Sequence, residues 1–124
     1  MDWKTKIFTS HTEESFNQLS LEIFHFQAKH NPVYKNYLAY LKINVSAINS
    51  VHEIPYLPIT FFKTHEVVCE PNKRTTVFSS SGTGGIQSKH FIHDLSLYEE
   101  SFIKGFEHFY GPIHDYTILA LLPS

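Results

Sequence analysis

Residue types that mark several special classes of protein are scarce in this sequence. Among 124 residues there is one cysteine, Cys69, so an internal disulfide is excluded. Only 18% of the residues are charged and the formal net charge is -2, so no basic stripe marks a nucleic-acid-binding protein. No apolar run is long enough for a membrane span, and residues 1–4 open no signal peptide. We therefore expect a soluble, cytoplasmic protein with no nucleic-acid partner and no membrane span.

Apolar and aromatic residues, by contrast, are abundant. Hydrophobic residues make up 42% of the chain, and aromatic residues 15%, with 11 phenylalanines and 7 tyrosines. This composition supplies enough apolar material for a core and argues against intrinsic disorder. The length suits one small domain.

The first part of the chain predicts two helices within residues 10–42. Ser10 and Glu13 have capping-box spacing, and Asn31-Pro32 reads as an N-cap followed by proline at the first helical position. The expected apolar positions of the first helix are Phe16, Leu19, Leu21, Ile23, Phe24 and Phe26. Those of the second are Tyr34, Tyr37, Leu38 and Leu41.

The middle of the chain predicts a strand–loop–strand unit over residues 75–93. The β-branched run at 75–78 and the stretch at 89–93 are the two expected strands. Before them, prolines at 55 and 58 disfavour a regular helix, and residues 67–69 predict a short strand.

The last part predicts a helix over residues 94–110 and a strand over 117–122. Asp94 is a good N-cap, Ser96 and Glu99 offer a capping box, and Gly111 ends the helix. The run at 117–122 is typical of a strand buried on both faces of a parallel sheet. Because such a strand needs covering elements, we expect the chain to be a piece of a longer protein that self-associates when isolated. The expected fold class is α/β, with N-terminal helices packed on a mixed sheet.

The stretch FSSSGTGGIQSKH, residues 78–90, concentrates small and hydroxyl-bearing residues. Glycines let backbone N–H groups converge into an anion-binding nest, hydroxyls add donors, and a lysine adds positive charge. The Walker A and GxGxxG patterns are both absent, because Gln87 stands where each requires a glycine. Two interpretations stay open at this point: a phosphate-binding loop and a plain flexible hairpin loop.

Longer stretches carry a family resemblance. SSGTGG resembles the Ser-Ser-Gly-Thr-Thr-Gly phosphate loop of the acyl-adenylate-forming (ANL) enzymes. IPYLPITFFKTHEV, SSGTGGIQSKHFIHDLSLYEESF and YTILALLPS resemble the acyl-protein synthetase (LuxE-type) family of that superfamily, which is related to the phenylacetate-CoA ligases. The resemblance covers roughly residues 54–124. It implies that residues 1–124 are the incomplete N-terminal part of an acyl-adenylating ligase domain.

The resemblance also implies an activity. Members of the family use ATP and Mg²⁺ to activate a carboxylic acid as acyl-AMP, and the acyl group then passes to a thiol, either a protein cysteine or coenzyme A. The loop is implied to hold the ATP phosphates, and the residues carried over are Ser80, Ser81, Gly82, Thr83, Gly84, Gly85, Ser88 and Lys89. Gly84 replaces the second threonine of the family loop, and Lys89 stands one place later than in the commonest pattern.

The family's remaining machinery lies beyond Ser124, so the catalytic residues stay unknown. We expect the 124-residue chain itself to be inactive and to bind no cofactor tightly. An acyl- or aryl-CoA ligase is one alternative, and a non-catalytic binding or interaction module is another.

Histidine and cysteine also invite metal or nucleophile roles. His90 and His93, three apart on a strand, would point to opposite faces, and His25 and His30 form no better pair, so no metal site is expected. Cys69 is read as a small buried residue.

Overall fold

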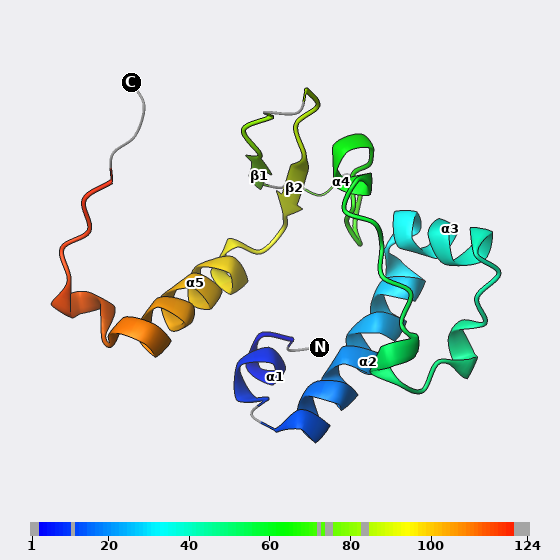
Figure 1. The fold of residues 1–124 in the computed structure, drawn as a ribbon, viewed down its shortest axis with the longest axis horizontal. Helices are drawn as coiled ribbons and strands as arrows, with labels where there is room; N and C mark the ends of the chain where they lie inside the picture. The colour runs from blue at the N-terminus through cyan, green and yellow to red at the C-terminus, as the bar shows by residue number, and fades with distance from the viewer. Residues whose placement is uncertain (1–2, 11, 72, 74–75, 83–84, 121–124) are drawn as a thin grey trace. The chain divides into compact units, whose positions relative to one another are not determined.

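The computed structural model describes residues 3–10, 12–71, 73, 76–82 and 85–120, and the chain divides into two units, 1–93 and 94–124 (Figure 1). The helices of the first unit are α1 (Trp3–Thr9), α2 (Glu13–His30), α3 (Pro32–Tyr40) and α4 (Phe61–Thr64), with short 3-10 turns η1 (Val45–Ala47) and η2 (Val51–Glu53). Its strands are β1 (Thr76–Ser79) and β2 (Lys89–Ile92). The second unit holds α5 (Leu95–Tyr110) and the 3-10 turn η3 (Ile113–Asp115). Helices together with strands confirm the α/β fold class.

Helix α2 begins at a different cap from the predicted one. The backbone N–H of Ser15 donates to Thr12 Oγ1 at 3.1 Å, and the N–H of Thr12 donates to Ser15 Oγ at 3.1 Å. This reciprocal pair satisfies two donors at the helix start, so Thr12 is the N-cap. The cap predicted at Ser10 is wrong, because the Ser10 hydroxyl contacts the Ser15 hydroxyl instead of a helix N–H. The preceding helix α1 was not predicted.

Asn31 makes the turn from α2 into α3. It ends α2 with an N–H bond to the carbonyl of Gln27, and its Oδ1 accepts the N–H of Tyr34 at 3.2 Å. Pro32 takes the first helical position, as the sequence predicts. The Asn31 side chain is only 4% exposed, and its Nδ2 donates to Gln27 Oε1 at 3.2 Å. A buried amide is therefore hydrogen-bonded through both of its ends.

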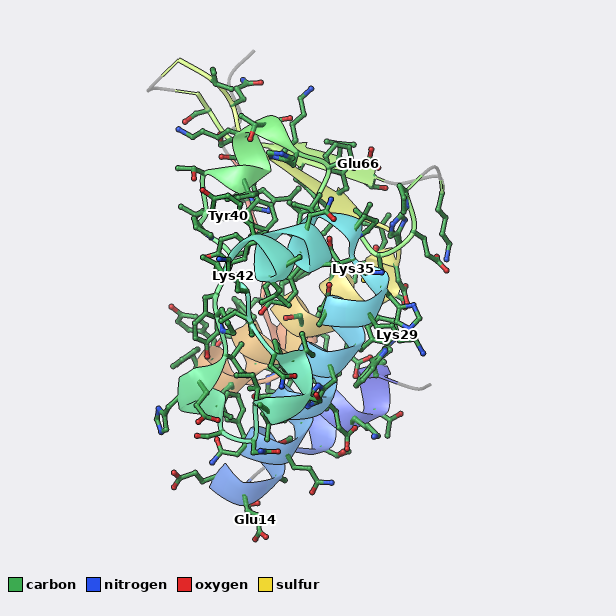
Figure 2. All side chains as sticks on the ribbon, turned by 90° about the vertical axis from the view of Figure 1, so that its right-hand side faces the viewer. Glu14, Lys29, Lys35, Tyr40, Lys42 and Glu66 are labelled. Carbon is green, nitrogen blue, oxygen red and sulfur yellow. The ribbon has the colours of Figure 1, made fainter. Side chains whose placement is uncertain are left out.

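The core lies between α2 and α3. Its buried members are Phe24, Ala28, Tyr34 and Leu38. Partly buried residues pack around them: Tyr37, Ile43, Val45, Ile48, Ile54 and Leu57. Charged side chains such as Lys29 and Lys35 are exposed on the outside of these helices (Figure 2). The predicted inward positions Phe16 and Leu41 are 59% and 42% exposed, because each lies at a helix end away from the α2–α3 contact.

Besides these apolar contacts, a hydrogen bond from a core tyrosine holds the segment after α3. Tyr34 OH donates to the carbonyl oxygen of Pro55 at 2.6 Å. Burial raises the pKa of Tyr34 to about 12, because the phenolate would lose its hydration. Residues 54–58 are irregular around the two prolines, and α4 follows.

Strands β1 and β2 form an antiparallel hairpin with the register Thr76↔Ile92 to Ser79↔Lys89. Both lie within the predicted unit over 75–93. Residues 67–69, predicted as a strand, have no strand partner and form none, although Val68 is buried. The sheet of the described residues is thus antiparallel and two-stranded.

In the second unit, Asp94 caps α5. Its Oδ1 accepts the N–H of Ser96 at 2.9 Å, so Ser96 lies inside the helix and the alternative capping box is not used. Gly111, with φ of +88°, ends the helix. Residues 117–120 have no regular secondary structure, so the strand predicted over 117–122 is not formed in its described part. A strand needs a hydrogen-bonding partner, and none of the described strands pairs with this segment. Residues 121 and 122 lie outside the described residues.

No described helix is both long and apolar enough to cross a membrane.

Candidate functional site

The serine- and glycine-rich loop is closed at its base by a pair of serines. Beyond the last strand pair, Ser79 and Lys89, the N–H of Ser80 donates to the carbonyl of Ser88 at 3.0 Å. The N–H of Ser88 donates back to Ser80 Oγ at 2.9 Å. These bonds extend the hairpin by one further pair, so the described residues 81, 82 and 85–87 lie in the loop that projects beyond it.

Gly82 sits where a side chain would not fit easily. Its φ is +70°, in the left-handed region that favours glycine. A Cβ built there would lie 2.7 Å from Cγ of Gln87. The carbonyl of Gly82 also accepts the N–H of Gly85 at 2.9 Å, which closes a tight turn. Gly85 itself has φ of +101°, with open space around it.

The predicted phosphate ligands differ in their exposure and in their hydrogen bonds. Ser81 and Lys89 are exposed, so both can reach an anion in solution. Ser80 and Ser88 form the base of the loop, and the Ser80 hydroxyl keeps a proton to donate. The N–H of Gly85 is engaged with Gly82 in this conformation, so it becomes available only if the turn opens. The predicted ligands Thr83 and Gly84 lie outside the described residues.

The charge of the hairpin suits an anion. Residues 76–92 include Lys89 and no aspartate or glutamate. A phosphate approaching the loop therefore meets no carboxylate from the hairpin itself, and one lysine attracts it.

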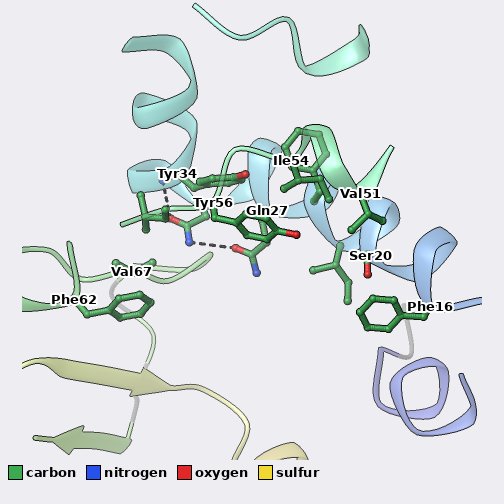
Figure 3. Close-up of a pocket in the computed structure, with 13 residues that line it drawn as sticks. Phe16, Ser20, Gln27, Tyr34, Val51, Ile54, Tyr56, Phe62 and Val67 are labelled. Atoms are coloured by element: carbon green, nitrogen blue, oxygen red, sulfur yellow. Dashed lines mark hydrogen bonds between the residues drawn. The ribbon is translucent and has the colours of Figure 1, made fainter. Parts of the chain in front are cut away.

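A second candidate is an apolar pocket of about 550 Å³ between α2 and residues 51–67 (Figure 3). The lining is mainly apolar and includes Phe16 and Ile23 of α2, Ile54 and Leu57 of the irregular segment, and Phe62 of α4. None of the lining residues is charged. A volume of this size is in the range of small-molecule sites.

Two polar side chains of this pocket, Gln27 and Asn31, are engaged with each other and with neighbouring groups. Gln27 Oε1 accepts from Asn31 Nδ2 at 3.2 Å and from Cys69 Sγ at 3.3 Å. Asn31 Oδ1 accepts the N–H of Tyr34 at 3.2 Å. Besides these amides the lining has the hydroxyls of Ser20 and Tyr56, but it holds no charged side chain to attract a carboxylate or a phosphate. It is therefore a weaker candidate for ATP than the loop.

Cys69 has the surroundings of a structural thiol. Burial raises the pKa of its thiol, and the carboxylate of Glu70 adds to the rise. A raised pKa reduces the thiolate fraction that would act as nucleophile. This supports the interpretation of Cys69 as a packing residue.

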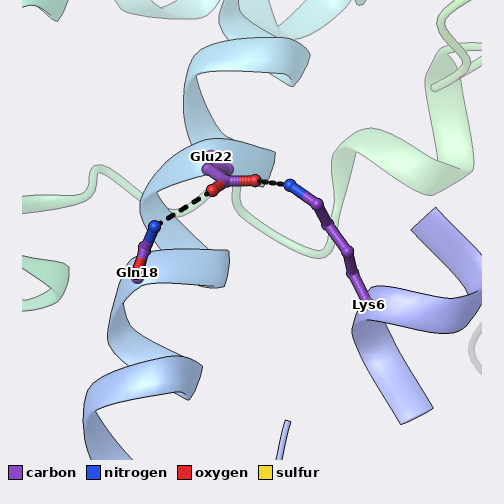
Figure 4. A network of polar contacts seen from close by, with 3 residues as sticks. All are labelled: Lys6, Gln18 and Glu22. Carbon is purple, nitrogen blue, oxygen red and sulfur yellow. Dashed lines mark hydrogen bonds and ion pairs between the residues drawn. The ribbon is translucent and has the colours of Figure 1, made fainter. Parts of the chain in front are cut away.

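A polar network lies on α1 and α2, away from the loop in sequence (Figure 4). Lys6 pairs with Glu22, whose Oε1 also accepts from Gln18 Nε2 at 3.4 Å. The hydrogen bond from Lys6 lowers the pKa of Glu22. Together with the edge-to-face contact of Trp3 and Phe26, whose ring centres are 5.3 Å apart, this network attaches α1 to α2. Its role is structural.

Among the described residues, no three histidine, cysteine, aspartate or glutamate side chains gather as a metal site. His90 instead stacks on Phe62, with 4.8 Å between ring centres, and His30 packs against Phe26 at 4.5 Å. The serine pair at the loop base and the Phe62–His90 contact were not predicted. The sequence offered one local indication, the pair of phenylalanines in FFKTH. This pair indicates that aromatic rings are available for a contact, but it does not predict which residue they contact.

Comparison with known families identifies the chain. A model of the family described as "Acyl-protein synthetase, LuxE" matches residues 6–115. That span includes α2, α3, the hairpin with its loop, and α5. Since it covers most of the sequence, the chain belongs to the LuxE family of acyl-protein synthetases, a family of ligases. No curated protein matches the chain significantly. No solved structure does so either.

Proposed function

We propose that this chain supplies the phosphate-binding loop of an AMP-forming acid–thiol ligase. The ligase activates a carboxylic acid with ATP and Mg²⁺ as acyl-AMP, releases pyrophosphate, and passes the acyl group to a thiol. The description of the matched family favours a protein thiol over coenzyme A as acceptor. The observation that carries the proposal is the serine-closed, carboxylate-free loop inside a chain of this family.

In this role, Ser81 and Lys89 would contact phosphate oxygens directly, and the Ser80–Ser88 pair would hold the loop ends. Thr83 and Gly84 belong to the proposed ligand set by their place in the motif. A bound Mg²⁺ would neutralise part of the phosphate charge.

We further propose that residues 1–124 alone do not complete adenylation. The acid, the ATP and the thiol must be held together for the reaction to proceed. The loop accounts only for phosphate contacts. Self-association of the chain also stays a prediction, which light scattering at several concentrations checks.

The first test measures phosphate binding by the 124-residue chain. Inorganic tripolyphosphate and Mg·ATP are titrated into the ¹⁵N-labelled chain, and amide shifts are followed by NMR. We expect the largest shifts between Ser80 and Lys89. Ser81→Ala and Thr83→Val each remove one hydroxyl that would bond to a charged group, so the affinity should fall about ten- to a hundredfold. Ser101→Ala, at an exposed position of α5, is the matched control and should leave the affinity unchanged.

The second test measures acid-dependent ATP–pyrophosphate exchange. We expect none from the 124-residue chain, and exchange from a protein in which the sequence continues beyond Ser124. Exchange by the short chain alone, above a heat-inactivated control, would contradict this expectation.

In the first test, loop amides that do not shift at saturating tripolyphosphate and Mg·ATP would contradict the proposed phosphate loop. The loop would then be a plain hairpin turn, and a non-catalytic module would be favoured.

A further inference from the structure

The hairpin that carries the loop has little support of its own. All four residues of β1 are exposed, and in β2 only Phe91 and Ile92 are partly buried. A two-stranded hairpin of four-residue strands is marginal in water without further packing. The position of the loop in the first unit must therefore depend on contacts from other elements.

Helix α4 provides such a contact. It packs against β2, and the Phe62 ring stacks on the His90 ring with 4.8 Å between centres and 22° between planes. His90 directly follows Lys89 and lies two residues after Ser88, at the base of the loop. The stack thus acts on the end of the hairpin from which the loop projects.

The same short helix is attached to the core by the neighbouring ring. The ring of Phe61 contacts the ring of Tyr37 in α3 edge-to-face, with 5.5 Å between ring centres. The Tyr37 ring in turn stacks on that of Tyr34, with 6.4 Å between ring centres, and Tyr34 is buried and hydrogen-bonded to Pro55. Ring contacts therefore attach α4 to the core through Phe61 and to β2 through Phe62, the next residue of the same helix.

We propose that Phe62 is a positioning residue, which holds the loop-bearing hairpin against α4 through its stack on His90. Its effect on phosphate binding rests on the proposed function of the loop, whereas its hold on the hairpin does not. Phe62 also lines the apolar pocket, so the effect of its ring on the hairpin must be separated from its effect on the pocket.

The experiment uses three variants of the 124-residue chain. Phe62→Leu keeps an apolar side chain in the pocket and removes the stacking ring. Phe62→Tyr keeps the ring and is the rescue variant. Phe16→Leu removes a pocket-lining ring that has no described contact with the hairpin, and is the matched control. The readouts, at one fixed pH, are the shielding of the His90 ring protons by the adjacent ring, amide exchange of residues 89–92, and affinity for tripolyphosphate.

In Phe62→Leu we expect the His90 ring protons to lose their upfield shift and the amides of β2 to exchange faster. Tripolyphosphate affinity should fall about three- to tenfold, the size expected for one aromatic pair. Phe62→Tyr should restore all three readouts, and Phe16→Leu should change none.

Unchanged His90 shifts and β2 exchange in Phe62→Leu would overturn the proposal. So would an unchanged affinity in a chain that does bind tripolyphosphate, because the ring would then not position the loop. If the unmodified chain binds neither tripolyphosphate nor Mg·ATP, the proposed function fails. In that case His90 shielding and β2 exchange alone decide whether Phe62 anchors the hairpin.

Discussion

The α2–α3 pair and the β1–β2 hairpin belong to the same unit but bury their side chains very differently. In the helix pair, Leu38 is 2% exposed, and both ends of the Asn31 amide are bonded inside the protein. In the hairpin, β1 is exposed throughout, and the described supports include the backbone pairs and the Phe62–His90 stack. Burial of apolar area is the main favourable term in folding, so the helix pair should contribute most of the stability.

The difference indicates a division of roles. Of these two regions, the hairpin carries the stronger candidate for ligand binding and has less buried surface. Binding segments are often drawn from regions of low local stability, because they must rearrange around a ligand. In this loop, the hydrogen bond from the Gly85 N–H to the Gly82 carbonyl must break before that N–H can bond to phosphate.

The largest expected effect is on the helix pair. Leu38→Ala removes the most deeply buried large side chain of the core, so the free energy of unfolding should fall by about 2–5 kcal/mol. Urea denaturation followed by circular dichroism measures the change. Leu41→Ala makes the same truncation at a position that is 42% exposed, and should cost less than about 1 kcal/mol. Equal losses at the two positions would mean that the core is not where the structure places it.

The next effect concerns the two helix caps. Asn31→Ala removes a buried cap and also the donor to Gln27, so it should cost about 2 kcal/mol. Thr12→Ala removes an exposed cap of α2 and should cost about 0.5–1 kcal/mol. Both losses are read from urea midpoints at constant slope. A larger loss at Thr12 would contradict the ranking by burial.

A smaller effect follows from pH at the core tyrosine. The pKa of Tyr34 is about 12 in the folded chain and near its ordinary value of 10 when unfolded, so the folded state favours the protonated phenol. Its contribution to stability is fully present below about pH 10 and is lost as the pH rises toward 12. Other tyrosines and lysines titrate in the same range, so the comparison needs a reference variant.

Tyr34→Phe provides this reference. It removes the bond to Pro55 and should cost about 1 kcal/mol at pH 8. Because phenylalanine does not ionise, the stability advantage of the unmodified chain over this variant should shrink between pH 10 and pH 12. Urea midpoints of the two chains at pH 8, 10 and 11 check this. An advantage that grows with pH would contradict the direction of the pKa shift.

Local features of the fold could be read from the sequence. Asn31-Pro32 and Gly111 mark helix ends through bonds that span at most a few residues, and the strand–loop–strand pattern depends on the composition of one short stretch. The error at Ser10 was also local, because the cap that forms, Thr12, lies only two residues away. For α5 the sequence offered two caps, and the structure uses the predicted Asp94 and not the box at Ser96.

Features that depend on distant partners could not be read in this way. The apolar run at 117–120 has strand-like composition, yet strand formation requires another strand, which composition does not supply. At the candidate site, the residue types of the loop were evident from the sequence. The Phe62–His90 stack joins residues 28 positions apart, so no local pattern predicts it.

The smallest expected effect on global stability is in the loop. Gly82→Ala places a Cβ at φ of +70°, 2.7 Å from Gln87 Cγ, so the turn should become strained by about 1 kcal/mol. Because we expect the hairpin to open without unfolding the α2–α3 core, the free energy of unfolding measured in urea should change by less than about 0.5 kcal/mol, while hairpin amides exchange faster and tripolyphosphate affinity falls. Gly105→Ala, in α5 with open space around the new Cβ, is the control and should leave both hairpin readouts unchanged. If Gly82→Ala destabilised the chain as much as Leu38→Ala, the hairpin would unfold together with the core, and the contrast between the two regions would not hold.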